Sequence, residues 1–137
     1  MEPPKHYWRV PTREAIDSLA ARFGLRNEPE MQGWEYEVAD ASRLPEFLAA
    51  MEGELTDDER FTLSLTVMES FEDWARAGAQ VATSDEWRRF VAILRARPSL
   101  YAYTLWSWSS PELEGWEISP LVRALWAKLE PTIRPPA

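Results

Sequence analysis

The chain has 137 residues and a formal net charge of −8, with eight tryptophans, one histidine and no cysteine. The lack of cysteine excludes disulfides, thiolate nucleophiles and cysteine-ligated zinc, and the acidic balance argues against binding to a nucleic-acid backbone. No run approaches the roughly 18 apolar residues of a membrane span, so we expect one soluble, cytoplasmic domain over residues 1–137, without cofactors. Its ends, at about 1–10 and 131–137, are expected to be flexible or extended.

The first predicted helix spans residues 12–23, with Thr12 as its N-cap and Gly24 just past its end. Apolar residues recur within it at the spacing of one helix face. The segment 34–38, WEYEV, instead alternates large apolar residues with glutamate, which is the pattern of a half-buried strand. A short helix over 43–52 follows this expected strand.

The segment 57–76 is predicted to be the central helix. The sequence TDDE at 56–59 has the spacing of a capping box, and apolar residues then cover a broad arc for about four turns. The part FTLSLTV at 61–67 also alternates like a strand, but the alternation stops after it, so a helix is favoured. A helix with so wide an apolar face is buried from more than one side and forms the core.

Three further helices complete the prediction. One covers 85–97, and the last covers 120–130 with Ser119 as its cap. Between them, 99–110 fits both a helix stripe and a strand face, and we favour the helix. The sequence therefore predicts a mostly α, single-domain bundle of about five to six helices, with one short β element near 34–38.

Side chains that carry common catalytic chemistry are few. The single histidine, His6, lies in a proline-flanked segment, and no glycine-rich loop or metal-binding motif is present. A carboxylate pair is the remaining possibility, because Glu69 and Glu72 share part of one predicted helix and a buried carboxylate there would have a raised pKa. The simpler interpretation is that Glu72 forms an i,i+4 ion pair with Arg76. The sequence therefore favours binding over catalysis.

The tryptophans outside regular apolar stripes are candidates for a binding surface. Trp74, Trp87 and Trp126 fall on apolar helix faces and are predicted to lie in the core. Aromatic side chains anchor many interfaces, and carboxylates steer the encounter with a basic partner. The candidate binding residues are three tryptophans and six acids: Trp106, Trp108, Trp116, Asp57, Asp58, Glu59, Glu112, Glu114 and Glu117.

Residues 34–108 contain, in order, WEYEVAD, LPEF, LTDDERFTLSLTVMESFED, a tryptophan-led helix and LYAYTLWSW. This order resembles a group of small, mostly uncharacterised bacterial proteins, some of which resemble immunity proteins of toxin systems. The resemblance rests on core-type residues, so it implies a helical fold and carries over no catalytic residue.

Together with the charge and the aromatic residues, the resemblance predicts an immunity-type inhibitor that occludes a basic toxin or effector, with no nucleic-acid or membrane partner. Two alternatives stay open. One is a small carboxylate-dependent enzyme, or a carbohydrate or small-ligand binder, with an aromatic pocket. The other is a self-associating accessory domain without a ligand.

Overall fold

The computed structural model describes residues 2–110, 112 and 115–135, and these residues contain α-helices and short 3-10 helices but no strand. The α-helices are α1 (Arg13–Phe23), α2 (Trp34–Glu37), α3 (Leu44–Glu52), α4 (Asp57–Arg76), α5 (Asp85–Ala96), α6 (Ala102–Trp108) and α7 (Ser119–Leu129). The 3-10 helices are η1 (Lys5–Tyr7), η2 (Ala41–Arg43), η3 (Val81–Thr83) and η4 (Glu130–Thr132). The all-α prediction is confirmed, and the described part has one α-helix more than the upper number expected. No helix in this part is both long and apolar enough to cross a membrane.

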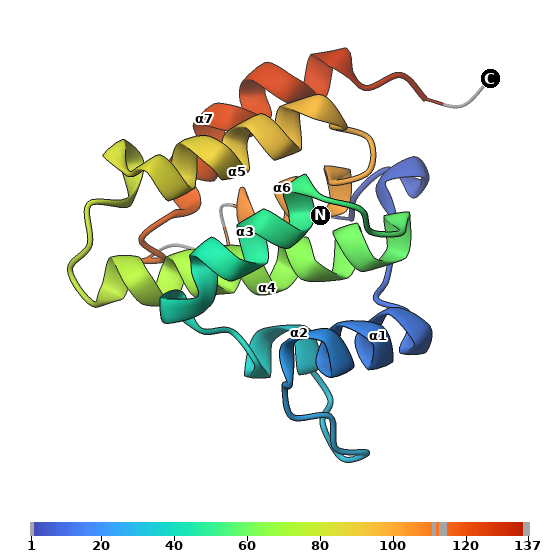
Figure 1. Ribbon diagram of the computed structural model, residues 1–137. Helices are drawn as coiled ribbons and strands as arrows, with labels where there is room; N and C mark the ends of the chain where they lie inside the picture. Colours follow the sequence, from blue (N-terminus) through green and yellow to red (C-terminus); the bar gives the residue numbers. More distant parts are fainter. Residues whose placement is uncertain (1, 111, 113–114, 136–137) are drawn as a thin grey trace.

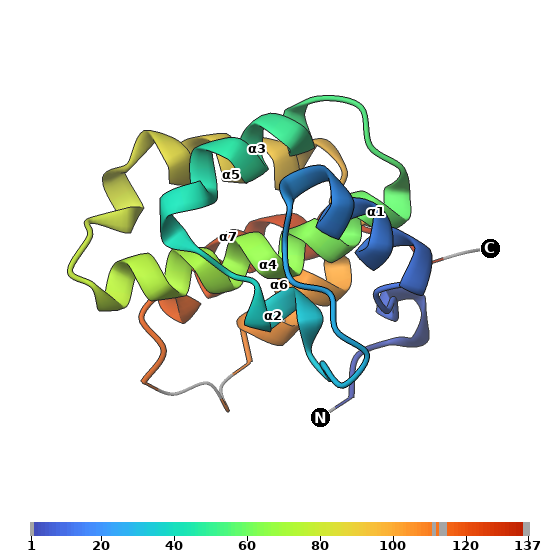
Figure 2. The ribbon, with the colours of Figure 1, turned by 60° about the horizontal axis from the view of Figure 1, so that its bottom comes forward.

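The 20-residue helix α4 lies in the middle of the bundle (Figure 1). It contacts α1 and α2 on one side and α3 on another, while α5 packs on α3 and α7 packs on α6 (Figure 2). The helix starts at the predicted capping box, in which the Thr56 hydroxyl and the Glu59 carboxylate each accept the other residue's backbone N–H. Several side chains on α4 are fully buried, as expected for a helix enclosed from several sides: Phe61, Leu63, Val67, Met68 and Phe71.

The strand predicted at 34–38 is wrong, because the first four of these residues form α2. Trp34 and Val38 are 3% and 8% exposed, whereas Tyr36 between them is 41% exposed. In a strand all three side chains would share one face, but on a helix residues four apart share a face and residues two apart lie on opposite sides. The buried Trp34 also donates its indole N–H to the Arg26 carbonyl at 2.6 Å, which holds the start of α2 in place.

Two details near the ends of the chain differ from expectation. The lead-in predicted to be extended contains η1, whose buried Tyr7 donates its hydroxyl hydrogen to the Glu130 carboxylate at 3.0 Å. Ser119 does not cap the last helix, because Ile118 occupies the N-cap position and Ser119 is the first helical residue. The first residues of the chain therefore pack against the end of α7, where Tyr7 also meets Trp126 edge to face.

Candidate functional site

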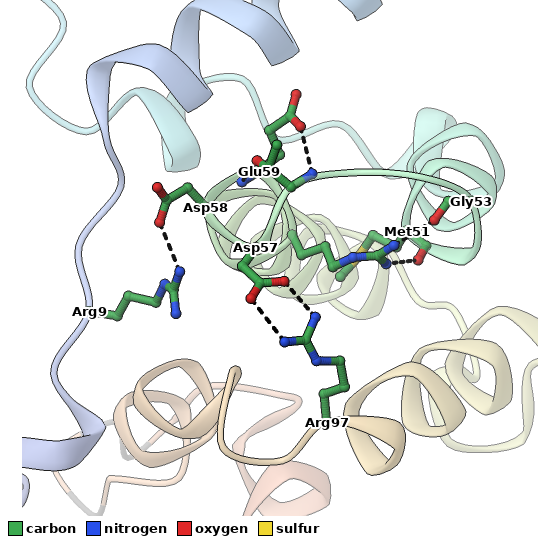
Figure 3. Close-up of polar contacts among 9 residues, drawn as sticks. Arg9, Met51, Gly53, Asp57, Asp58, Glu59 and Arg97 are labelled. Carbon is green, nitrogen blue, oxygen red and sulfur yellow. Dashed lines mark hydrogen bonds and ion pairs between the residues drawn. The ribbon is translucent and has the colours of Figure 1, made fainter.

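The three predicted acids at the start of α4 are engaged within the protein (Figure 3). Asp57 accepts two hydrogen bonds from the guanidinium of Arg97, which holds the pKa of Asp57 below its ordinary value. Asp58 pairs with Arg9 at 2.8 Å, and Glu59 closes the capping box. These side chains hold the N-terminal segment and the end of α5 against α4.

The three predicted tryptophans lie in different surroundings. Trp108 is only 4% exposed, because its ring packs edge to face against Trp116 with the ring centres 5.1 Å apart, so it is not an exposed anchor. Trp106 is partly buried and lines a separate cavity of about 450 Å³, together with Glu112. Glu114 lies outside the described residues.

Trp108 and Trp116 line a pocket of about 300 Å³ where α2, α4 and the segment between α6 and α7 come together. Its walls are Tyr36 from α2, Glu69 from α4, Ser107 and Trp108 from α6, and Trp116 from the following segment. The lining therefore combines three aromatic rings with one carboxylate and two hydroxyls, those of Tyr36 and Ser107. Concave, mostly apolar sites with a few placed polar groups are typical of ligand pockets.

Tyr36 reaches this pocket because α2 is fixed to α4 at both of its ends. Trp34 is buried at the start, and beyond the end the backbone N–H of Asp40 donates to the Ser70 hydroxyl on α4 at 3.0 Å. Partial burial of the Tyr36 side chain, together with the negative charge of Glu35, raises the pKa of Tyr36 to about 12. This phenol therefore stays protonated at neutral pH and can donate a hydrogen bond at the pocket.

A buried carboxylate on α4 positions Trp116. Glu72 is 1% exposed, and its oxygens accept the backbone N–H groups of Glu117 and Ile118, each at 3.0 Å, and the Nε–H of Arg76 at 2.7 Å. The segment that precedes α7 is thereby attached to α4, directly after Trp116. The predicted i,i+4 pair between Glu72 and Arg76 is confirmed, but the two long-range backbone contacts were not foreseen.

The guanidinium of Arg76 lies over the ring of Trp116, 5.0 Å from its centre. The hydrogen bond to Glu72, followed by the charges of Glu72, Glu117 and Glu69, raises the pKa of Arg76. Beside the pocket the chain thus already combines a guanidinium with a tryptophan face and a carboxylate, an arrangement stabilised by cation–π attraction and by charge.

The carboxylates around the pocket are only partly compensated by positive charge, because Arg76 lowers the pKa values of Glu69 and Asp73 by less than the other causes raise them. Burial raises the pKa of Glu69, and the charges of Asp73 and Glu72 raise it further. Burial also raises the pKa of Asp73 and, on α2, that of Glu35. Within the part of the chain that the structure describes, Glu69 takes part in no ion pair. A partly buried anion without a partner favours the approach of a cation.

We expect Glu69→Gln to raise the free energy of unfolding at pH 7. Because the folded-state pKa of Glu69 is raised, the native protein binds more protons than the unfolded chain between the two pKa values, and stability falls as pH rises through that window. Glutamine removes this penalty, which is below about 1 kcal/mol after screening by solvent. Urea denaturation at pH 7 and at about pH 3.5, where the difference should vanish, measures the effect.

Glu46→Gln is a control for which we expect a change in stability of the opposite sign. The hydrogen bond from Arg43 lowers the pKa of Glu46, so the stability contributed by this carboxylate is present above its ordinary pKa and is lost as pH falls through the lowered one. Glu46→Gln should therefore lose stability at pH 7, and the loss should shrink in acid. A Glu69→Gln variant that is less stable than the wild type at pH 7 would show that the charge of Glu69 is already compensated.

Within the described residues, no three histidine, aspartate or glutamate side chains are placed to hold a metal ion. Comparison of the chain with models of protein families, with curated proteins and with solved structures finds no match. The function is therefore inferred from the pocket and the charges around it.

Proposed function

We propose that this protein is an acidic binding domain for a basic protein partner, acting as an immunity-type inhibitor that occludes a toxin or effector. The observation that carries the proposal is the pocket lined by Tyr36, Trp108 and Trp116, in which Glu69 has no ion pair within the described part of the chain. Aromatic pockets take the anchor residues of many interfaces, and complementary charge fixes which partner enters.

The distribution of charge favours one surface of the molecule as the binding surface for the basic partner. At the start of α4, Asp57 and Asp58 are paired with arginines. Near its end Glu72 pairs with Arg76, but Glu69 takes part in no ion pair within the described residues, and the pKa values of Glu69 and Asp73 are raised. The two ends of this 20-residue helix are about 30 Å apart at the rise of an α-helix. The partner is therefore expected on the surface formed by α2 and the end of α4, and not at Asp57, Asp58 and Glu59, which are three of the six acids predicted from the sequence.

The contacts of Glu72 favour binding over acid–base catalysis. A carboxylate that works as an acid or base must exchange a proton with a substrate. Both oxygens of Glu72 instead accept hydrogen bonds from Glu117, Ile118 and Arg76, and the residue is buried and does not line the pocket. Glu69 is thus left as a single carboxylate in an aromatic pocket, which suits recognition of a positive charge.

A pull-down from a lysate of the source organism, at low and then high salt, tests this proposal. The tagged wild type should retain one basic protein in near-equal amount at low salt and release it at high salt, because screening weakens charge attraction. Glu69→Lys should lose this protein, whereas Glu54→Lys, an exposed acid in the loop before α4, should keep it. Equal recovery by both variants, or no basic protein at either salt, would contradict the proposal.

A further inference from the structure

The pocket offers a cation three aromatic walls and one carboxylate. Tyr36, Trp108 and Trp116 supply the rings, and the two tryptophans meet edge to face, so that the walls stand at an angle to one another. A ring face carries negative electrostatic potential and attracts cations. Glu69 supplies a full negative charge, and Ser107 supplies a hydroxyl that can accept a hydrogen bond.

The surroundings favour a guanidinium over an ammonium group. A guanidinium is flat and weakly hydrated, so it can stack on an aromatic wall and still form a two-pronged contact with a carboxylate. An ammonium group is a compact, strongly hydrated charge and would lose more hydration in a pocket whose walls are mostly rings. The volume of about 300 Å³ leaves room for the end of one such side chain.

Next to the pocket, the chain itself already contains an arginine that lies on an aromatic ring beside a carboxylate. Arg76 places its guanidinium over the face of Trp116 while its Nε–H donates to a carboxylate at 2.7 Å. Arg43 likewise lies over Phe23 and Phe47 and pairs with Glu46. In this protein, therefore, arginines lie on aromatic rings where a carboxylate is near. The pocket likewise places the Glu69 carboxylate beside the rings of Tyr36, Trp108 and Trp116, of which Trp116 already carries Arg76 on one face.

We propose that the pocket formed by Tyr36, Glu69, Trp108 and Trp116 receives the side chain of one arginine presented by the basic partner. This inference rests on the proposed function and names the group that the partner must supply. The guanidinium stacks on an indole ring, its N–H groups donate to Glu69, and the entering charge compensates the carboxylates on this face. An arginine placed in this way would be the central anchor of the interface.

Titration of the whole protein with N-acetyl-L-argininamide, followed by tryptophan fluorescence, tests the inference. The probe carries only the guanidinium charge, and its uncharged, nearly isosteric analogue N-acetyl-L-citrullinamide is the matched control. We expect saturable binding of the arginine compound, with the citrulline and lysine analogues weaker by about tenfold, equivalent to the loss of one charge-assisted contact. Glu69→Gln should weaken the arginine compound by a similar factor, and Glu54→Gln should leave its affinity unchanged.

The possible results separate this inference from the proposed function. The arginine assignment would be overturned if the arginine compound bound no more tightly than the citrulline compound or the lysine compound. It would also be overturned if Glu69→Gln had no effect on binding of the arginine compound. Retention of a basic partner without binding of N-acetyl-L-argininamide would leave the proposed function standing and overturn this inference. Binding of the arginine compound without any basic partner would support the pocket assignment and contradict the proposed function.

Discussion

Glu72→Ala should lower the free energy of unfolding by about 3 kcal/mol. The substitution leaves the backbone N–H groups of Glu117 and Ile118 without their acceptor, and an unsatisfied buried donor costs about 1–3 kcal/mol. The guanidinium of Arg76 is half-exposed, so water compensates its charge and it adds little to the loss. Urea denaturation measures the change in stability, and the fluorescence of Trp116 should shift to that of a more solvated indole as its segment detaches from α4.

Two variants show which part of this loss belongs to the buried contacts. Glu72→Gln keeps the shape and one acceptor oxygen, so it should cost clearly less than the alanine variant. Glu46→Ala removes a carboxylate that also pairs with an arginine, but at the surface and just before α3, so its loss of stability should be small compared with that of Glu72→Ala. If Glu72→Ala costs no more than Glu46→Ala, then Glu72 does not hold the segment before α7.

Trp116→Ala should weaken binding of the basic partner by about 30-fold. Central aromatic anchors commonly contribute about 2 kcal/mol or more to binding, and 1.4 kcal/mol corresponds to a factor of ten. Trp116 lines the pocket, packs against Trp108 and lies under the guanidinium of Arg76, so its removal opens one wall. Calorimetric titration with the recovered partner measures the affinity, and circular dichroism of the free variant checks that the fold is retained.

Trp8→Ala is the matched control for this substitution. Trp8 is 50% exposed, and its ring is tilted against that of Tyr103 with the ring centres 5.2 Å apart, outside the residues that line the pocket. Its removal takes away a similar aromatic area from the surface, yet we expect a change in affinity of less than about threefold, as for most contacts away from an anchor. Equal losses for Trp8→Ala and Trp116→Ala would place the partner somewhere other than the pocket.

The helices with clear local signals could be predicted from the sequence. Thr12 caps α1 by accepting the backbone N–H of Ala15, and Gly24 ends that helix with a φ of 65°. The capping box at the start of α4 is likewise present. These features depend on residues within one turn of each other, so the sequence contains all the information that they require.

The error at 34–38 has a different physical origin. A helix of four residues makes barely one turn, which is too short for a 3.6-residue period to show, and WEYE matches a two-residue alternation equally well. Only the burial of Trp34 and Val38 on one side, with Tyr36 on the other, distinguishes the helix. That burial is created by α4, which lies about 30 residues further along the chain, and no local pattern reports it.

The pocket could be predicted only in part. The sequence singled out Trp108 and Trp116, and it foresaw the pair between Glu72 and Arg76. It missed Tyr36, because the strand interpretation placed this residue on a buried face. It considered Glu69 only as half of a carboxylate pair. These residues meet because α2 and α6 pack on α4 and Glu72 attaches the segment before α7 to α4, and such long-range contacts leave no spacing signal in one sequence.

The most direct test is the indole N–H spectrum of ¹⁵N-labelled protein during titration with the recovered basic partner. Each of the eight tryptophans gives one signal, so the spectrum reports which of them the partner meets. The proposed pocket predicts that the signals of Trp116 and Trp108 move, while that of Trp87, buried on α5, stays in place. Movement of the Trp8 signal with no change at Trp116 would show that the partner binds elsewhere.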